Sequence, residues 1–434
     1  MNKLEFVNHS CIILSNNNVS LAMDPWTEGS VFNNSWDLLV KTPANTIENL
    51  KKVKYIWFSH EHPDHFNPPN LKIFNKNTNF LFQKTKDRRV VNFLSKISPN
   101  INELSYNEEF FLDKSFSIRI IPFQYLDSMC LINLNGIKIL NLNDCDIKNE
   151  KQLILIKKLC GHIDVLMVQF SYAIGKSNKD SVNEREYWSS LILKKLSNNI
   201  NFLQPKYVIP FASFCYFSRT DNFYLNDSIN KIGPTIDYLK KNSPEVNFLS
   251  FFPGDTWNFN EKLDNNISIN KYADYYKNIT PKKIDNKITN FSELKKVSDL
   301  FIKTTKQKNN LFQLYNLFLK KNFKLFFNLT DVKMKCKFNF DDGLKEIEDY
   351  DSSKPSCFLT SGSLFQLFNS GYGYDALIIG GRFEANNFGL KNLNKIFKFQ
   401  AKNYQNIYYN YQDLFNNLIN KISNKSVLFH KREN

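Results

Sequence analysis

Residues 60–65, His60-Glu61-His62-Pro63-Asp64-His65, combine three imidazoles and a carboxylate in one short segment. The whole chain contains only 6 histidines, so half of them fall in this cluster. Such crowding is costly unless a cation organises it, and imidazole with carboxylate is the usual ligand set for zinc and for non-heme iron. The cluster therefore predicts a metal site.

The cluster directly follows the apolar run 55–58, which is typical of a buried strand. Open α/β sheets place their chemistry at the carboxyl ends of strands, where the next side chains fan out around one point. We therefore expect a strand to position the cluster, with the metal at the carboxyl end of that strand.

The first 260 residues read as short strands joined by turns, with few helices. Asn135-Gly136 is a strong signal for a type I′ hairpin turn. The expected strands cover residues 4–7, 11–14, 19–22, 54–58, 118–123, 130–134, 137–142, 164–168, 207–210 and 246–251. Strands alternating with occasional helices predict an α/β fold, a layered sandwich, for residues 1–260.

One helix is predicted over residues 181–196. Ser181 followed by Glu184 fits a capping box at its start. Its apolar face is expected to comprise Tyr187, Leu191 and Ile192.

The second half of the chain differs in character. Residues 261–290 are polar and are predicted to be a linker, and residues 291–434 are predicted to form an α+β accessory domain that shapes or covers the active site. The expected elements are a helix over 291–319, paired strands over 323–329 and 332–338, a short helix over 363–368, and a helix from residue 390 onward.

The net charge of +15 raises nucleic acid or an anionic surface as a partner. The lysines are scattered, however, and the chain is rich throughout in Asn, Lys, Ile and Phe, as an AT-rich coding sequence would produce. We therefore disfavour nucleic acid as a partner and expect the charge to help attract an anionic small molecule.

The 7 cysteines include no Cys-x-x-Cys pair, which argues against a disulfide framework or a zinc ribbon. The first residues contain no apolar signal core, and no stretch approaches the ~20 apolar residues that a membrane span needs. We expect a cytoplasmic protein that does not enter a membrane.

The His-x-His-x-Asp-His cluster after a strand is similar to the metal-binding motif of the metallo-β-lactamase fold. Residues 1–260 therefore resemble this fold, which is an αββα sandwich. Residues 8–14 and Asp24-Pro25-Trp26 are similar to the opening of the branch that contains ascorbate-phosphate lactonases and N-acyl-phosphatidylethanolamine phospholipases. Within that branch the chain looks most similar to the metallo-β-lactamase-like part of CMP-N-acetylneuraminate hydroxylases. The stretches that carry this similarity are residues 24–30, 138–145, 210–212 and 252–254.

The resemblance implies roles for particular residues. His60 and His62 would bind a first metal, and Asp64 and His65 a second. Asp144, just after the expected strand 137–142, matches the carboxylate that bridges the two metals, with Asp146 as a competitor. The implied cofactor is one or two zinc ions, or iron.

The chain departs from the family pattern at two further histidines. Where the first would lie, Gln124 or Asp127 could supply an oxygen ligand, and the choice stays open. At the second, Arg219 cannot bind a metal because it stays protonated, but it could grip a phosphate or carboxylate of the substrate. His9 could contact a ligand or substrate, or could be a buried histidine bonded to the backbone. Asp24 is expected to fix the loop under the site.

We predict a metal-dependent hydrolase acting on an anionic sugar- or nucleotide-type molecule, with Asp64 as general base if it is free of metal. The first alternative is an iron oxygenase component like the CMP-N-acetylneuraminate hydroxylases but without its own Rieske domain. The chain has one Cys-x-His, at Cys160 and His162, and no Cys-x-x-His, so it would need a separate electron donor. A non-catalytic ligand-binding protein is the other alternative, and a nuclease is disfavoured by the lack of clustered basic residues.

Overall fold

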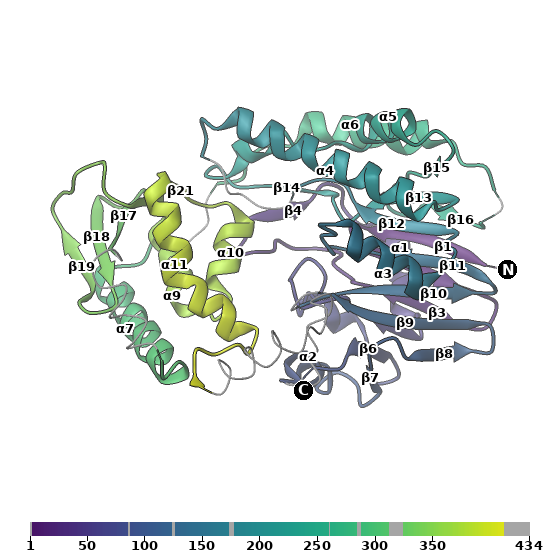
Figure 1. The fold of residues 1–434 in the computed structure, drawn as a ribbon, viewed down its shortest axis with the longest axis horizontal. Helices are drawn as coiled ribbons and strands as arrows, with labels where there is room; N and C mark the ends of the chain where they lie inside the picture. Colours follow the sequence, from purple (N-terminus) through teal and green to yellow (C-terminus); the bar gives the residue numbers. More distant parts are fainter. Residues whose placement is uncertain are drawn as a thin grey trace.

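The computed structural model describes residues 2–85, 87–123, 126–172, 178–259, 261–283, 288–311 and 324–411. Two seven-stranded sheets face each other in the N-terminal part of the molecule (Figure 1). The first sheet consists, in spatial order, of β16 (Thr256–Trp257), β1 (Lys3–Asn8), β2 (Cys11–Ser15), β3 (Ser20–Met23), β5 (Tyr55–Trp57), β6 (Asn79–Gln83) and β7 (Ile101–Leu104). The second consists of β15 (Asn247–Phe248), β13 (Tyr207–Phe211), β12 (Val165–Gln169), β11 (Ile137–Asn141), β10 (Asp127–Leu134), β9 (Phe116–Phe123) and β8 (Glu109–Asp113).

Helices cover the outer face of each sheet, which completes the αββα sandwich (Figure 1). On the first sheet lie α1 (Ala44–Lys51) and α2 (Arg89–Leu94). On the second lie α3 (Glu150–Cys160), α4 (Val182–Leu203) and α5 (Ile232–Asn242), with α6 (Asn265–Asn278) against α5. Shorter elements are β4 (Trp36–Leu38) paired with β14 (Cys215–Phe217), and the 3-10 turns η1 (Asn70–Ile73) and η2 (Phe223–Asn226).

Alternation along each strand divides the apolar side chains between two cores. In β2, Ile12 and Leu14 belong to the core between the sheets, whereas Cys11 and Ile13 pack under the helices on the outside. Successive side chains of a strand point to opposite faces, and here both faces are covered. The strands therefore read as continuous apolar runs.

Parallel pairing brings the ends of several strands to the same edge. β3, β5 and β6 run parallel in the first sheet, as do β11, β12 and β13 in the second. β2 is antiparallel to β3, and β10 is antiparallel to β11, so each of these strands starts at the edge where its neighbour ends. The ends of β3, β5 and β11 therefore lie at the same edges as the β1–β2 turn and the start of β10.

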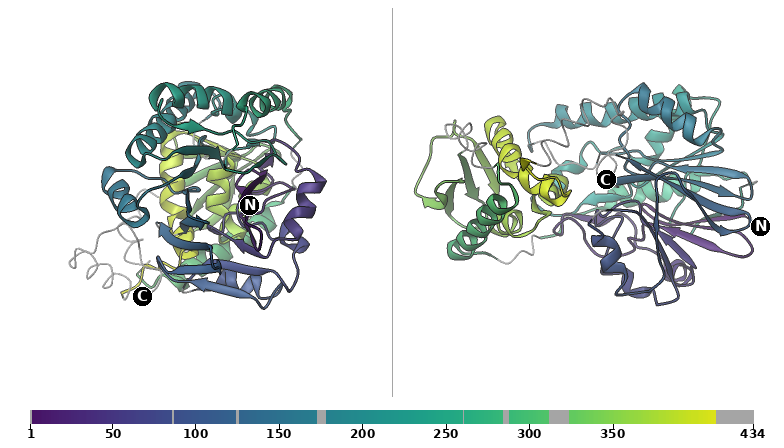
Figure 2. Two further views of the ribbon diagram at one scale, coloured as in Figure 1. Left: turned by 90° about the vertical axis from the view of Figure 1, so that its right-hand side faces the viewer. Right: turned by 60° about the horizontal axis from the view of Figure 1, so that its bottom comes forward.

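The C-terminal part forms a second α+β unit with its own core (Figure 2). Its five-stranded sheet consists of β19 (Gly343–Ile347), β18 (Met334–Asn339), β17 (Leu325–Leu329), β20 (Ser356–Leu359) and β21 (Glu384–Ala385). Its helices are α7 (Phe291–Lys308), α9 (Ser361–Asn369), α10 (Gly373–Gly380) and α11 (Asn387–Tyr404). The α/β class with an added α+β unit is therefore confirmed.

Close contacts join the two units through α10 and the residues after it, which lie nearest the sandwich in Figure 1. Arg382, only 2% exposed, binds the carboxylate of Asp221 with Nε 3.0 Å from Oδ2 and donates from Nη1 to the carbonyl of Asn33 at 3.0 Å. A Cβ on Gly380 would lie 2.3 Å from Oγ of Ser35, so the backbone of α10 approaches the sandwich more closely than another residue would allow.

Several local expectations differ from the structure. Ser181 makes no side-chain cap, and Tyr187 is 63% exposed, so the capping box and that part of the apolar face were wrong. A serine at the first position of a helix caps it only if its hydroxyl lies close enough to accept a hydrogen bond from a backbone N–H of the first turn. The capping box forms instead at Asn290 and Glu293, at the start of α7.

Residues 261–290, for which the sequence predicts a linker, contain helix α6. The segment is polar in composition, but Tyr272 and Tyr276, four positions apart on α6, are buried and hold the helix against the protein. Helix α10 was not predicted from the sequence. Among the described residues, no helix is both long enough and apolar enough to cross a membrane.

Candidate metal centre

The predicted site residues come together at one edge of the sandwich because each lies at a strand end. His60 follows β5, Asp144 follows β11, and Asp24 follows β3. Asp127 is the first residue of β10, and His9 lies in the turn between β1 and β2. Both sheets therefore contribute to the same site.

One group of possible ligands consists of His9, Asp64 and His65, all buried. Oδ2 of Asp64 lies 3.6 Å from Nε2 of His9 and 3.4 Å from Nε2 of His65. Oδ2 of Asp144 lies 3.2 Å from the same His65 nitrogen. Two atoms that each bind a tetrahedral zinc at its usual distance lie about 3.3 Å apart. His9, Asp64 and His65 thus have the spacing of ligands to one cation, and Asp144 lies next to this group.

A second group consists of His60, His62 and Asp144. Nε2 of His60 lies 3.8 Å from Oδ2 of Asp144 and 3.9 Å from Oδ1 of Asp127. The same oxygen of Asp144 therefore faces both groups. Of the two oxygen donors that the sequence leaves open, Asp127 thus lies beside His60, and Gln124 lies outside the described residues.

Buried polar atoms test whether a cation fits. Among the described residues, none forms a hydrogen bond with either ring nitrogen of His9, with Oδ1 of Asp64 or with Oδ1 of Asp144, although all four atoms are buried. Leaving a buried polar atom unpaired costs about 1–3 kcal/mol. A cation would supply the missing partner, so the donor set fits a metal.

The pKa values reflect an excess of negative charge in the cluster. Burial acts to lower the pKa of His65, but Asp144, Asp64 and Asp24 outweigh it and raise that pKa well above its usual range. Burial also acts to raise the pKa of Asp64, yet the charge of His65 and the close polar contacts with the rings of His65 and His9 hold that pKa well below its usual range. A site with this potential stabilises a cation.

Around the ligands, Asp24 fixes the geometry. It is fully buried and accepts hydrogen bonds from Nδ1 of His65 (3.0 Å), from the backbone N–H of Ser59 (2.8 Å) and from the Ser59 hydroxyl (2.7 Å). The side-chain amide of Asn143 donates to it as well. A carboxylate that orients a ligating histidine in this way is a common feature of metal sites. Asp24 thus fixes its loop, as predicted, and also contacts a candidate ligand directly.

Four residues around the centre have a strained backbone. His9, Asp24, Asn143 and Ala212 all have positive φ, at 44°, 42°, 49° and 52°. Such conformations cost non-glycine residues about 1–2 kcal/mol each and cluster at functional sites. The amide of Ala212 donates to the carbonyl of His9 at 2.9 Å, which helps to hold the β1–β2 turn in place.

The C-terminal unit reaches the site through aromatic contacts. The ring of Tyr372 lies 5.8 Å from that of His62, and the ring of Phe32 lies 6.1 Å from His62 on the sandwich side. Burial lowers the pKa of His62, which favours the neutral imidazole that binds metal. The accessory unit therefore covers part of the centre.

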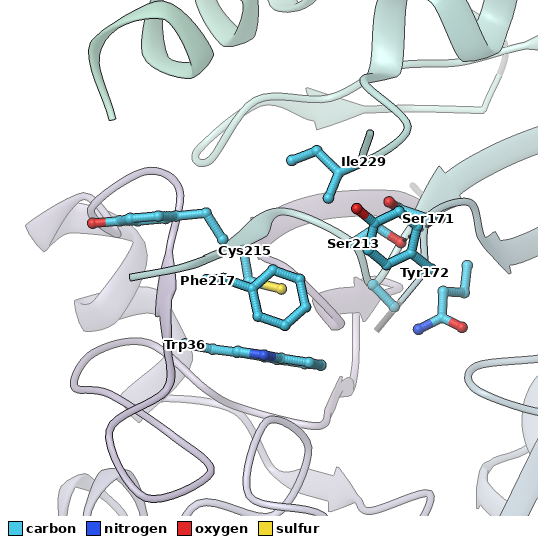
Figure 3. Close-up of a pocket in the computed structure, with 10 residues that line it drawn as sticks. Trp36, Ser171, Tyr172, Ser213, Cys215, Phe217 and Ile229 are labelled. Carbon is cyan, nitrogen blue, oxygen red and sulfur yellow. Dashed lines mark hydrogen bonds between the residues drawn. The ribbon is translucent and has the colours of Figure 1, made fainter. Parts of the chain in front are cut away.

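A cavity of about 350 Å³ opens beside the ligands and extends along α4. His62, Asp64, Asp127 and Asp144 line its metal end. This volume falls in the range of small-molecule pockets, roughly 300–1,000 Å³. A neighbouring hollow of about 20 Å³, seen in Figure 3 between Trp36, Phe217 and Tyr172, has room for a single water molecule only.

Arg219 does not have the position expected of a substrate-binding residue. It does not line the cavity; its Nε donates to the carbonyl of Asn34 at 2.5 Å and its Nη2 to the hydroxyl of Ser30 at 3.0 Å. The sequence could not show that this guanidinium is used to hold a loop. His9, in contrast, lies among the possible metal ligands. Its backbone carbonyl accepts a hydrogen bond, whereas its ring nitrogens form none with the described residues.

Comparison with known proteins agrees with this architecture. Residues 3–212 match the family described as the beta-lactamase superfamily domain. The N-terminal part of the chain is thus similar to domains of the metallo-β-lactamase superfamily, and the resemblance seen in the sequence is confirmed.

Among particular relatives, the chain is similar to cytidine monophosphate-N-acetylneuraminic acid hydroxylases. The protein of Mus musculus is 26% identical over 267 residues, which are 56% of this chain and 45% of the mouse protein. The inactive protein of Homo sapiens is 25% identical over 266 residues, covering 56% of this chain and 52% of the human one. The chain thus spans about half the length of these curated relatives.

Two solved structures are also similar. CmlA, a diiron beta-hydroxylase from Streptomyces venezuelae, has 14% identity and a TM-score of 0.43, with 59% of this chain and 54% of that chain covered. The isothiocyanate hydrolase from Delia radicum gut bacteria has 14% identity and a TM-score of 0.44, with 59% and 98% covered.

Proposed function

We propose that the protein is a metal-dependent hydrolase whose centre would hold two cations, with Asp144 as a ligand that both positions share. The single observation that carries this proposal is that one oxygen of Asp144 faces both ligand groups at the end of a cavity large enough for a small molecule. The first cation would be held by His60, His62, Asp127 and Asp144. The second would be held by His9, Asp64, His65 and Asp144.

Bound divalent cations would supply a water of lowered pKa and would polarise the bond to be cleaved. The protein's own residues fix where this happens. Asp24 orients His65, and Ser59 contacts Nδ1 of His60 at 2.9 Å. The side chains of Asp127 and Asp144, 20% and 19% exposed, reach the cavity and can hold a water there by hydrogen bonds.

Asp64 is better suited to a ligand role than to the general-base role expected from the sequence. It is only 3% exposed and its Oδ2 lies between His9 and His65. A general base must reach the proton that it accepts. We therefore propose Asp64 as a ligand of the second cation.

The oxygenase alternative is favoured by one specific observation. Each proposed position combines two imidazoles with two carboxylates, a donor set that suits iron as well as zinc. The curated relatives named above are hydroxylases. In that reaction the protein would need a separate electron donor.

One experiment distinguishes the two reactions. The metal-loaded protein is incubated with a panel of activated carboxylic esters, lactones and phosphodiesters, with and without dioxygen. Turnover that is equal under both conditions and is lost in the His60→Ala/His62→Ala variant supports a hydrolase. Turnover that requires dioxygen and a reductant, together with iron in the protein, would contradict it.

A further inference from the structure

The wall of the cavity beyond the metal ligands is mostly apolar, and helix α4 supplies one side of it. Residues at the spacing of a single face of α4 line it: Trp188, Leu191, Ile192, Lys195, Leu196 and Asn199. Four of these six are apolar. Leu191 and Ile192 are partly exposed because they face the cavity instead of the protein core.

The opposite wall continues the apolar surface. It includes Leu142, Cys145 and Ile147, which follow β11, together with Val168 from β12. Apolar side chains thus face one another across the space that leads away from Asp144.

The cations that line the cavity are already paired with carboxylates. Nε of Arg185 lies 2.8 Å from Oδ1 of Asp227, and its Nη1 donates to the carbonyl of Asn178 at 2.7 Å. Nζ of Lys195 lies 2.5 Å from Oδ1 of Asp146. Among the described residues, these are the only Lys or Arg side chains that line the cavity. Because both side chains are paired with carboxylates, neither is placed to bind a phosphate group.

We propose that the substrate carries an apolar arm, an alkyl, acyl or aryl group, that lies between α4 and the residues after β11 while its scissile group sits at the metal ligands. This inference rests on the proposed function and narrows its substrate. A sugar or nucleotide moiety would bury many polar groups against Leu142, Leu191 and Ile192 without partners, which is unfavourable. An apolar arm gains free energy in proportion to the area it buries there.

A series of straight-chain hydroxamic acids tests the proposal, because the hydroxamate group binds a protein-bound metal and the chain samples the cavity. Binding of aceto-, butyro-, hexano- and octanohydroxamic acid to the metal-loaded full-length protein is measured by calorimetry. The dissociation constant is expected to fall about threefold for each added methylene. Suberic acid monohydroxamate, which has a carboxylate at the far end, is expected to lose most of that gain.

Variants of α4 provide the matched control. Leu191→Asn should weaken octanohydroxamate about tenfold and leave acetohydroxamate unchanged, which also shows that the variant is folded. Tyr187→Ser lies on the same helix but outside the cavity and should change neither value. Equal affinity for all chain lengths would contradict the proposal of an apolar arm but would remain consistent with the metal centre. Failure of every hydroxamate to bind, in a protein that contains no metal, would overturn both.

Discussion

Nδ1 of His65 donates to Oδ2 of Asp24 across 3.0 Å, and this contact turns Nε2 of His65 toward Asp64 and Asp144. Asp24 comes from the end of β3 and His65 from the segment after β5, two parallel neighbours in the first sheet. The sheet itself thus sets the direction of a metal ligand.

Replacing Asp24 by Asn should lower metal affinity about 10- to 100-fold, because an amide orients His65 less strongly and adds no negative charge. Competition with a chromogenic chelator measures the change. Asp37→Asn is the matched control: Asp37 is also buried and pairs with Lys282 at 2.7 Å, but does not line the cavity. If both variants lose affinity equally, the effect is a general loss of stability and Asp24 has no special role.

His9→Asn should reduce the metal content from two ions per chain to one. Asparagine tolerates the positive φ of 44° at this position but is too short to replace the imidazole. Elemental analysis of dialysed protein gives the stoichiometry. His162→Asn, at a side chain that is 69% exposed and pairs with Asp164, should keep two ions. An unchanged stoichiometry in His9→Asn would remove His9 from the ligand set.

The two carboxylates Asp127 and Asp146 line the same cavity but should behave differently. Asp127→Asn should lower the affinity of the first position about tenfold or more, since it removes a charged donor 3.9 Å from His60. Asp146→Asn should leave affinity unchanged, because Asp146 is paired with Lys195. Isothermal titration of metal into stripped protein distinguishes the variants, and equal affinities for both would contradict the assignment.

Asp375 in α10 makes stability depend on pH. Burial raises the pKa of this carboxyl from 3.8 to about 6. Between these values the folded protein keeps a proton that the unfolded chain releases, so the free energy of unfolding falls as pH rises, by about 3 kcal/mol. Urea denaturation of the wild type and of Asp375→Asn across this range should show the variant gaining relative stability with pH. Parallel curves would contradict the raised pKa.

Because functional side chains follow strand ends, the sequence alone located five of the seven proposed ligands. The cluster 60–65 and Asp144 each follow an apolar run, and the structure brings them together. Sequence also limited the oxygen donor to Gln124 or Asp127. Local patterns of this kind are visible without knowing how strands pair.

What the sequence could not show depends on long-range pairing. His9 reaches Asp64 only because β1, β2, β3 and β5 share a sheet. Arg219 was aligned with a missing histidine, yet its guanidinium holds the loop at Asn34 and Ser30. The sequence predicts an apolar face on helix α4 that includes Leu191 and Ile192, and in the structure both residues line the cavity. Apolar periodicity is the same for a face that packs in the core and for one that lines a cavity, so the sequence could not distinguish them.

Elemental analysis of the purified full-length protein tests the central claim most directly. The wild type is predicted to contain two divalent transition-metal ions per chain, and the His60→Ala/His62→Ala variant is predicted to lose at least one of them while remaining folded by circular dichroism. A folded wild-type protein that binds no metal, even after incubation with zinc or ferrous iron, would contradict the account.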